Sequence, residues 1–361
     1  MLGYWFDWNP DPYAFYIDWL GRPVAWYGIL FVLGFVIGYW IISRLFVRCM
    51  RENGEVTVHH VADWDSLVRR VKEALNHTED LLYSVFKSLP REVQRLLAKD
   101  APLDEKTRQA IVTAIKDHRS LLEKELPEVL EPLSAPSIKM ADRLTWYVVL
   151  GTVVGARLGH VIFYELGDYW KRPWDILKIW EGGLASHGGA VGVMLALWVS
   201  RGYLRRYAPS MTFLRLLDLV AIPTALVACF IRLGNFVNQE LVGIPTDLPW
   251  GVLFGNPADT GPLEPRHPVP LYDAFANLAI FFFLGALWRK WGTKLPEGLL
   301  IGLFFVLCFT ARFFIDFIKM PMDSTVETGF LQMGQWLSLP FVIGGAYLIW
   351  RVKDEMWHRL E

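Results

Sequence analysis

Cysteine and net charge are both scarce in this sequence, and each shortage excludes a class of function. The 361 residues include three cysteines, Cys49, Cys229 and Cys308, whose spacing fits neither a metal site nor a redox pair. The formal net charge is −1, so the composition gives no indication of nucleic-acid binding. No basic segment precedes the first apolar stretch, and we therefore expect this stretch to stay as an anchor and not to be a cleaved signal peptide.

Apolar residues, in contrast, are abundant. The chain is 53% hydrophobic and contains 17 tryptophans, which is typical of a protein that crosses a membrane several times. Because one span needs about 20 mostly apolar residues, the sequence predicts an all-α, polytopic membrane protein in the lipid bilayer with about seven transmembrane helices. Their expected ranges are 24–46, 142–164, 184–202, 216–235, 270–290, 297–318 and 333–350.

Basic residues are concentrated in alternate loops between these spans. The loops after the first, third and fifth spans and the C-terminal tail are rich in them, for example Arg44, Arg48, Arg201, Arg205, Arg289, Lys290, Arg351 and Lys353. Since cytoplasmic loops carry an excess of positive charge, we expect a periplasmic N-terminus and a cytoplasmic C-terminus. An odd number of spans agrees with this orientation.

Residues 51–140 differ from the rest of the chain, because about a third of them are charged and their apolar residues recur at helical spacing. This pattern predicts a soluble helical insertion in the first cytoplasmic loop. It would separate the N-terminal segment and first helix (1–50) from a transmembrane core (141–361), which carries a small periplasmic head loop at 236–269. The insertion is either a partner-binding module or an appendage without a role in chemistry.

Three arginines, Arg157, Arg232 and Arg312, lie within predicted spans. A charged side chain at membrane depth costs at least ~2.5–3.5 kcal/mol unless it is paired or hydrated. Each arginine is about 15 residues along an outward-running span, roughly 22 Å from its start. Tyr27 and His187, early in inward-running spans, fall at the same level. A single arginine could be snorkelling or ion-paired, but the shared depth favours a binding site for one anion in the outer leaflet.

The residue types at this level suit an anionic lipid headgroup. A guanidinium binds phosphate through two parallel hydrogen bonds, and His187 can take up a proton near neutral pH, although a structural histidine remains an alternative. Arg232 and Asn235 share a helix face at i, i+3. Arg312 and Asp316 at i, i+4 are expected to form an intrahelical ion pair.

Several motifs resemble the bacterial prolipoprotein diacylglyceryl transferases. They run in order through the predicted membrane part as AWYG (25–28), GARLGHVIFY (155–164), WEGGLASHGG (180–189), RLGNFVNQE (232–240), RHPVPLYDA (266–274), ARFFIDF (311–317) and MGQWLS (333–338). The resemblance implies a seven-helix inner-membrane enzyme that needs no metal or cofactor. Its expected reaction transfers the diacylglyceryl group of phosphatidylglycerol to the lipobox cysteine of a preprolipoprotein signal peptide, forming a thioether and releasing glycerol phosphate.

By the same resemblance, the family's functional histidine falls on His187 and its two key arginines on Arg232 and Arg312, which are the expected catalytic residues. The residues expected to bind substrate are Tyr27, Arg157, Gly188, Gly189, Asn235, Glu240, Arg266 and Asp316. The chain departs from the family pattern at four places: Asp316 replaces a glutamate, Cys308 a tyrosine, Val269-Pro270 a Ser-Gln pair, and Ile231 a glycine.

Two alternatives to an enzyme are a lipid transporter or flippase and a scaffold that recruits partners. A lipid transporter or flippase could use the same cationic pocket, but it needs a polar path to the cytoplasmic side, and the inner halves of the spans hold few ionisable residues besides Asp218. A scaffold that recruits partners through the insertion leaves the polar residues in the outer leaflet without a role. A mass gain on a lipobox peptide would distinguish the enzyme from both.

Overall fold

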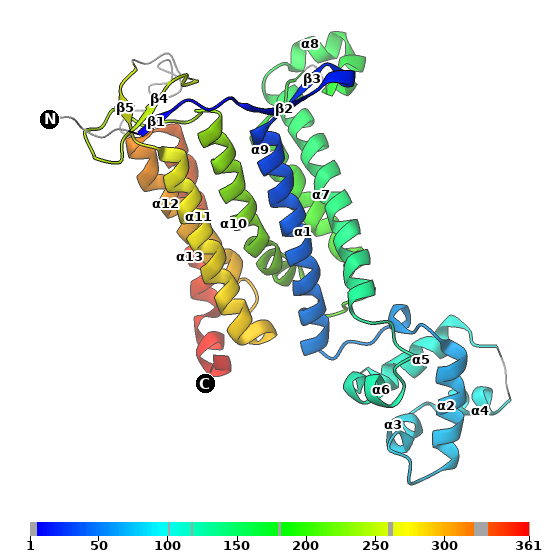
Figure 1. The fold of residues 1–361 in the computed structure, drawn as a ribbon. Coiled ribbons are helices and arrows are strands. Elements are labelled where there is room, and N and C mark those ends of the chain that lie inside the picture. Colours follow the sequence, from blue (N-terminus) through cyan, green and yellow to red (C-terminus); the bar gives the residue numbers. More distant parts are fainter. Residues whose placement is uncertain are drawn as a thin grey trace. The chain divides into compact units, whose positions relative to one another are not determined.

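A computed structural model describes residues 6–99, 102–116, 118–179, 182–258, 263–320 and 331–360. Most of these residues are helical, and Figure 1 shows the order of the helices along the chain. The chain forms two compact units, of which one comprises Met1–Ile42 with Leu217–Glu361 and the other Ser43–Leu216. The first helix, α1 (Trp26–Glu52), and the helix α10 (Phe213–Val237) each begin in one unit and end in the other.

The unit Ser43–Leu216 contains the predicted helical insertion. Its elements are η2 (Val58–His60), α2 (Trp64–Asn76), α3 (Tyr83–Lys87), α4 (Arg91–Ala98), α5 (Glu105–Ile115) and α6 (Arg119–Glu125). Asp63 and Asp104 cap α2 and α5 by accepting hydrogen bonds from backbone N–H groups three residues ahead. The apolar faces of the helices in this insertion share one core that includes Leu67, Phe86 and Ile111. These residues are therefore helical, as their periodicity predicted, while their cytoplasmic location stays a prediction.

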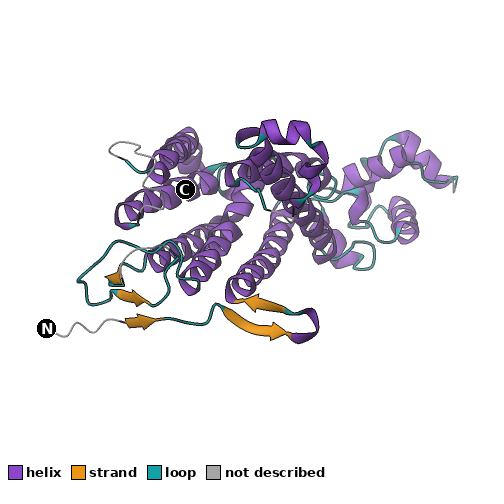
Figure 2. Cartoon of the chain, turned by 90° about the horizontal axis from the view of Figure 1, so that it is seen from above, coloured by secondary structure: helices purple, strands orange, loops and turns teal. Residues whose placement is uncertain are grey.

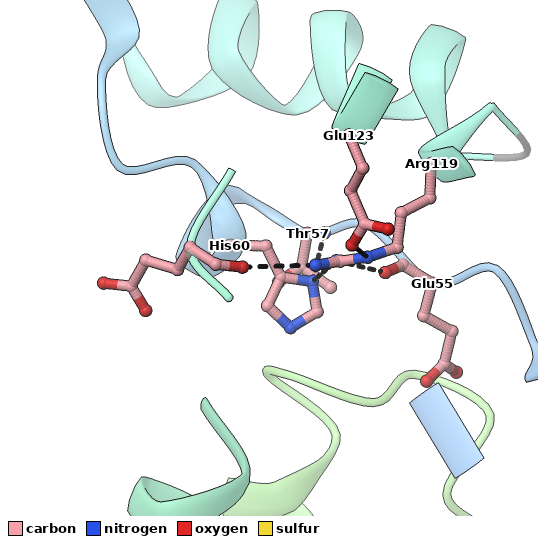
Figure 3. A network of polar contacts seen from close by, with 6 residues as sticks. Glu55, Thr57, His60, Arg119 and Glu123 are labelled. Atoms are coloured by element: carbon pink, nitrogen blue, oxygen red, sulfur yellow. Dashed lines mark hydrogen bonds and ion pairs between the residues drawn. The ribbon is translucent and has the colours of Figure 1, made fainter. Parts of the chain in front are cut away.

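A buried arginine ties the two ends of this insertion together (Figure 3). The guanidinium of Arg119, which is 3% exposed, donates hydrogen bonds to the carbonyl oxygens of Glu55 (3.1 Å) and Glu131 (3.2 Å). It also pairs with Glu123 at 2.8 Å and lies 3.3 Å from Nδ1 of the fully buried His60. Burial and then the Arg119 charge lower the pKa of His60 to about 4, so this imidazole is neutral at physiological pH.

The helices α7 (Ser134–Phe163) and α9 (Ser186–Leu204) pack in the same unit at unusually short range. Glycines face each other where they cross, and a Cβ atom at Gly155 would lie 2.5 Å from the carbonyl oxygen of Gly188. The glycines of α7 therefore form a packing surface. The short helices α8 (Leu166–Lys171) and η3 (Pro173–Leu177) form the connection between α7 and α9.

The other unit contains α11 (Val269–Trp291), η5 (Gly292–Lys294), α12 (Leu299–Ile315), η6 (Asp316–Ile318) and α13 (Met333–Leu360), together with the parts of α1 and α10 that belong to it. The helix α12 packs against both α11 and α13. The buried carboxylate of Asp218 accepts hydrogen bonds from the N–H groups of Gly298 and Ile301, at 2.8 and 2.9 Å. Asp218 therefore satisfies donors at the start of α12, which gives this buried carboxylate a structural role.

Five short strands were not part of the all-α prediction. The strands β1 (Phe6–Trp8), β4 (Val252–Phe254) and β5 (Pro265–Arg266) form one sheet, while β2 (Tyr13–Ile17) and β3 (Arg22–Ala25) form a hairpin around η1 (Asp18–Leu20). Figure 2 shows both sets of strands beside the helix ends. The three-stranded sheet contributes Val252 and Phe254 of β4 to a small core with Phe236 and Val242, so the region predicted as a head loop contains strands.

Five helical segments are long and apolar enough to cross a membrane, namely Trp26–Glu52, Ser134–Phe163, Phe213–Val237, Val269–Lys294 and Leu299–Ile318. They correspond to the first, second, fourth, fifth and sixth predicted spans. The third and seventh predicted spans are helical as well, in α9 and α13, but among the described residues they do not belong to this set. A count of seven spans therefore stays a prediction, as does the orientation.

Candidate active site

The C-terminal end of α10 forms the most polar part of the candidate site. Nη1 of Arg232 donates to Oδ1 of Asn235 at 3.3 Å, which confirms the predicted i, i+3 contact. Nδ2 of Asn235 in turn donates to the Glu240 carboxylate at 2.7 Å, and Asn238 donates to the same carboxylate at 3.1 Å. One relay of hydrogen bonds therefore links the arginine to the glutamate.

The backbone after α10 bends sharply to make this relay possible. Gln239 and Leu241 have φ angles of 55° and 58°, a region that residues other than glycine rarely adopt. These two positions flank Glu240 and bring its side chain back against the helix end. Strain of this kind persists where the surrounding structure holds it and is frequent at functional sites.

Tyr27, at the start of α1, lies against the same turn of α10. A Cβ atom at Gly234 would be 2.7 Å from Cδ2 of the Tyr27 ring, so this close approach requires a glycine. Gly234 lies between Arg232 and Asn235 in the sequence. Two elements far apart in the chain, predicted from sequence to lie at one membrane level, are therefore in contact here.

Asp273 of α11, which was not among the residues predicted from the sequence, also pairs with Arg232. Oδ2 of Asp273 lies 3.1 Å from Nε of Arg232, and both side chains are mostly buried. The sequence could have indicated Asp273, because a carboxylate one turn into an apolar span needs a cationic partner. Asp273 comes within the RHPVPLYDA motif, but its partner depends on how α10 and α11 pack.

The two predicted catalytic arginines of this unit, Arg232 and Arg312, line one pocket of about 140 Å³. Arg232, Asp273 and Arg312 line it, together with Asn277 and Cys308. The Cys308 thiol donates to Oδ1 of Asn277 at 3.6 Å. Since a water occupies about 30 Å³ in the liquid, the pocket suits a group the size of one phosphate.

Arg312 is held by its predicted partner on the same helix. Nε of Arg312 lies 3.9 Å from Oδ2 of Asp316, whose side chain is 7% exposed. The Asp316 carboxylate packs directly on Gly334, in the first turn of α13, where a helix N-terminus favours negative charge. The Arg312 side chain remains 41% exposed, which leaves donors for a ligand.

Arg266 has a different environment from the pocket residues. It is 1% exposed and lies in β5, where its backbone pairs with Val252 and Pro245. The neighbouring His267 is within 3.2 Å of the Tyr272 hydroxyl through Nδ1, and burial lowers the pKa of its imidazole. These contacts place Arg266 in the small sheet and outside the residues that line the pocket, so its substrate-binding role stays a prediction.

His187, Gly188 and Gly189 belong to the other unit, at the start of α9. The His187 ring is exposed and makes an edge contact with Phe163, with the ring centroids 5.1 Å apart. It lines one part of an apolar groove of about 630 Å³ between α7 and α9. Gly188 lies at the close crossing with α7, and a Cβ at Gly189 would meet Ala156 at 3.5 Å, an ordinary contact distance.

Arg157, the third arginine predicted to bind the anion, is engaged by backbone carbonyl groups. Its guanidinium donates to the oxygens of Asp175, Ile176, Gly182 and Gly183 at 2.5, 2.8, 2.7 and 3.2 Å. Its carbon centre also lies 5.0 Å from the Tyr169 ring centroid. Arg157 therefore holds the connection between η3 and α9, a role that the sequence did not distinguish from phosphate binding.

Among the residues that the structure describes, no group of three or more His, Cys, Asp or Glu side chains could hold a metal ion. In the unit that contains α10–α12, guanidinium, carboxylate, amide and thiol groups line the small pocket. Such groups bind and orient an anion, and they stabilise negative charge that develops on it.

Comparison with known proteins identifies the family. The family model described as prolipoprotein diacylglyceryl transferase matches residues 110–351. A protein of Protochlamydia amoebophila is 42% identical over 366 residues, covering 99% of this chain and 96% of its own length. One of Tolumonas auensis is 50% identical over 208 residues (58% of this chain, 77% of its own), and one of Porphyromonas gingivalis 41% over 233 residues (62% and 81%).

All three relatives carry the name phosphatidylglycerol–prolipoprotein diacylglyceryl transferase. The match to the P. amoebophila protein is long enough to include most of residues 51–140. With a family match over more than half of the chain and a relative of this identity along almost its whole length, the chain belongs to the prolipoprotein diacylglyceryl transferase family.

Proposed function

We propose that this protein transfers the diacylglyceryl group of phosphatidylglycerol to the thiol of the lipobox cysteine in preprolipoproteins. The products are a thioether-linked lipid on the acceptor and free glycerol phosphate. Family membership supports the reaction. The structural observation that carries the proposal is the pocket lined by Arg232, Arg312 and Asp273, because two guanidinium groups at one small cavity suit a phosphodiester.

The proposed setting is the bacterial inner membrane, with seven spans, a periplasmic N-terminus and a cytoplasmic C-terminus. The five apolar helical segments and the distribution of basic residues support this arrangement. It places the polar end of α10 and the small sheet in a periplasmic head, on the side where a translocated signal peptide arrives. Residues 51–140 would then be cytoplasmic.

In the proposed mechanism, the acceptor thiol attacks a glyceryl carbon and the phosphate leaves. A cysteine thiol with a pKa near 8.5 is mostly protonated at neutral pH, so we assign proton removal to His187. Arg232 and Arg312 bind the phosphate and stabilise the charge that grows on the departing oxygen. The contacts of Arg232 with Asn235 and Asp273 fix its orientation before substrate arrives.

The remaining predicted residues have supporting roles in this proposal. Tyr27 and Glu240 orient the glycerol headgroup beside Arg232, and Asp316 holds Arg312. Gly188 allows α9 to approach α7, so that His187 is presented at the start of α9. Gly189 is proposed to contact the substrate beside it. Arg157 contributes by fixing the connection that leads to α9.

The direct test incubates purified protein with phosphatidylglycerol and a lipobox peptide, and measures the mass of the peptide. A mass gain of one diacylglyceryl group on the cysteine supports the function, whereas an unmodified peptide with active controls rejects it. The Arg312→Lys variant should lose about 10²-fold or more in transfer rate, because a point ammonium cannot replace a planar two-bond donor. Wild-type turnover by this variant would contradict the proposed role of Arg312.

The role of His187 has its own test in the same assay. If His187 accepts the thiol proton, His187→Gln lowers the rate and changes how the rate depends on pH. A variant that keeps both the rate and the pH profile of the wild-type protein would show that His187 is structural.

A further inference from the structure

Asn277 lines the pocket that contains Arg232 and Arg312, and none of the roles above includes it. This residue of α11 is 7% exposed, and its side chain carries two N–H donors and a carbonyl acceptor. A buried amide costs free energy unless its polar groups are hydrogen-bonded. The contacts of the Asn277 amide therefore decide whether it has a donor left for a ligand.

Two hydrogen bonds determine the orientation of the Asn277 amide. Nδ2 donates to the backbone carbonyl oxygen of Asp273 at 2.8 Å, and Oδ1 accepts from the Cys308 thiol at 3.6 Å. A carbonyl oxygen only accepts hydrogen bonds, so the amide nitrogen must face Asp273 and the amide oxygen Cys308. In the described part of the chain, Nδ2 donates to no other acceptor. Its second hydrogen is therefore available to a ligand in the pocket.

The pocket has two levels along the three helices that form it. Each of α10, α11 and α12 contributes one residue to either level, four positions apart, which is about 6 Å along a helix axis. The outer level, nearer to the helix ends, consists of Arg232, Asp273 and Arg312. The inner level consists of Ala228, Asn277 and Cys308. Among the residues that line the pocket, the charged ones are therefore confined to the outer level.

The polarity of the pocket changes in the same order as the groups of a glycerophospholipid. The outer level offers two guanidinium groups, which suit the phosphate. The inner level offers the neutral donor of Asn277, which suits the carbonyl oxygen of an acyl ester, because an ester can only accept hydrogen bonds. Three residues deeper on α11, Ile280 continues the lining with an apolar side chain, which suits an acyl chain.

We propose that Asn277 donates its free Nδ2 hydrogen to an acyl ester carbonyl of phosphatidylglycerol, so that the pocket selects lipids with ester-linked chains. This inference rests on the proposed function, in which Arg232 and Arg312 bind the phosphate. Because one hydrogen is available, one of the two ester carbonyls is bound. The glyceryl carbon that the thiol attacks lies between the phosphate and the esters, so the two contacts together restrict its orientation.

A purely structural role for Asn277 leads to a different expectation. Its bond with Cys308 connects α11 to α12, and loss of this connection alone would disturb the pocket for every lipid. Loss of a donor to the ester, in contrast, affects only a lipid that has the ester carbonyl. Dialkyl phosphatidylglycerol, in which ether links replace both esters, keeps the phosphate and lacks the carbonyls. The two lipids therefore distinguish the two roles.

The test measures kcat/KM of peptide lipidation with diacyl and dialkyl phosphatidylglycerol for wild type, Asn277→Leu and the control Asn76→Leu. Asn76 is exposed at the end of α2, in the other unit. We expect wild type and Asn76→Leu to prefer the diacyl lipid about tenfold more strongly than Asn277→Leu does, which is the effect of one hydrogen bond. A folded Asn277→Leu protein with the lipid preference of wild type would overturn the proposal.

A second measurement needs no variant and uses the wild-type protein in detergent. Equal amounts of the diacyl and dialkyl lipids are added without peptide, and native mass spectrometry measures which lipid the protein retains. We expect the diacyl lipid to be retained severalfold more often, because it alone offers the carbonyl acceptor. Equal retention of the two lipids would refute the role of Asn277. Absence of lipidation by wild type with either lipid would refute the proposed function separately.

Discussion

The contact between Tyr27 and Gly234 gives a sharp test of how the candidate site is assembled. The Gly234→Ala substitution places a methyl carbon 2.7 Å from Cδ2 of the tyrosine ring. Carbon atoms pack best at about 3.5–4.0 Å, so the ring or the helix must retreat by about 1 Å. A shift of this size at a positioning residue can lower a rate about 10²-fold, equivalent to about 2.7 kcal/mol of activation free energy.

A double-mutant cycle assigns this loss to one contact. The rates of peptide lipidation are measured for wild type, Gly234→Ala, Tyr27→Ala and the double variant. We expect Gly234→Ala to be about 10²-fold slower in the presence of Tyr27, and to add less than about twofold once the ring has been removed. The control is Gly285→Ala on α11, where a Cβ atom would meet nothing within 4 Å.

Two outcomes of the cycle would refute the reasoning. If Gly234→Ala is as active as wild type, the ring does not need its position against α10. If the loss caused by Gly234→Ala is equally large without Tyr27, the methyl group acts through another neighbour. Thermal unfolding in detergent accompanies the rates, because overpacking alone costs about 1–3 kcal/mol of stability and must be distinguished from an effect on catalysis.

Arg157 and His60 give two further predictions. The lysine of Arg157→Lys cannot bond to all four carbonyl groups that Arg157 reaches in two segments, so limited proteolysis should cleave the connection 164–185 faster. The control, Arg172→Lys at an exposed site, should leave the cleavage rate unchanged. The pKa of His60 is about 4 in the folded protein and near 6.5 when unfolded. The stability it contributes is therefore complete above pH 6.5 and is lost as the pH falls toward 4, by up to about 3 kcal/mol. His60→Asn should flatten the dependence of the unfolding free energy on pH. Burial raises the pKa of Glu55, which has the opposite effect on stability, and this effect cancels when the curve of the variant is subtracted from that of wild type. Parallel curves for the two proteins would disprove the assignment to His60.

Sequence reasoning succeeded where contacts are local. The helical spacing of Arg232 with Asn235 and of Arg312 with Asp316 determines both pairs without any knowledge of packing. It failed for Asp273, because the identity of its partner depends on which helices pack together. Hydropathy and the expected orientation predicted a shared membrane level for Tyr27 and Arg232, which stays a prediction, and the contact of Tyr27 with α10 required the tertiary fold.

The role of Arg157 shows a different limit. A guanidinium in an apolar span needs acceptors, and the sequence does not say whether these are a ligand's oxygens or the chain's own carbonyls. The small sheet was missed for a third reason. Strands of two to five residues leave almost no periodic signal, and the partner of β1 is β4, far along the chain at Val252–Phe254. The seven predicted spans exceed the five apolar segments because α9 and α13 are less apolar. The helix α9 includes His187, Arg201 and several glycines, and α13 carries many polar residues.

The pairing of β1 with β4 also constrains the order in which the protein can be assembled. Phe6 pairs with Val252, and the Trp8 indole donates to the Phe236 oxygen at 3.0 Å. The first strand to leave the ribosome must therefore wait until α10 and β4 have been synthesised and have arrived on the same side of the bilayer. Contacts of such long range are slow to form. A bulky fusion at the N-terminus, or a stall during insertion of the intervening helices, would leave this part of the protein unfinished while the later helices are still being made.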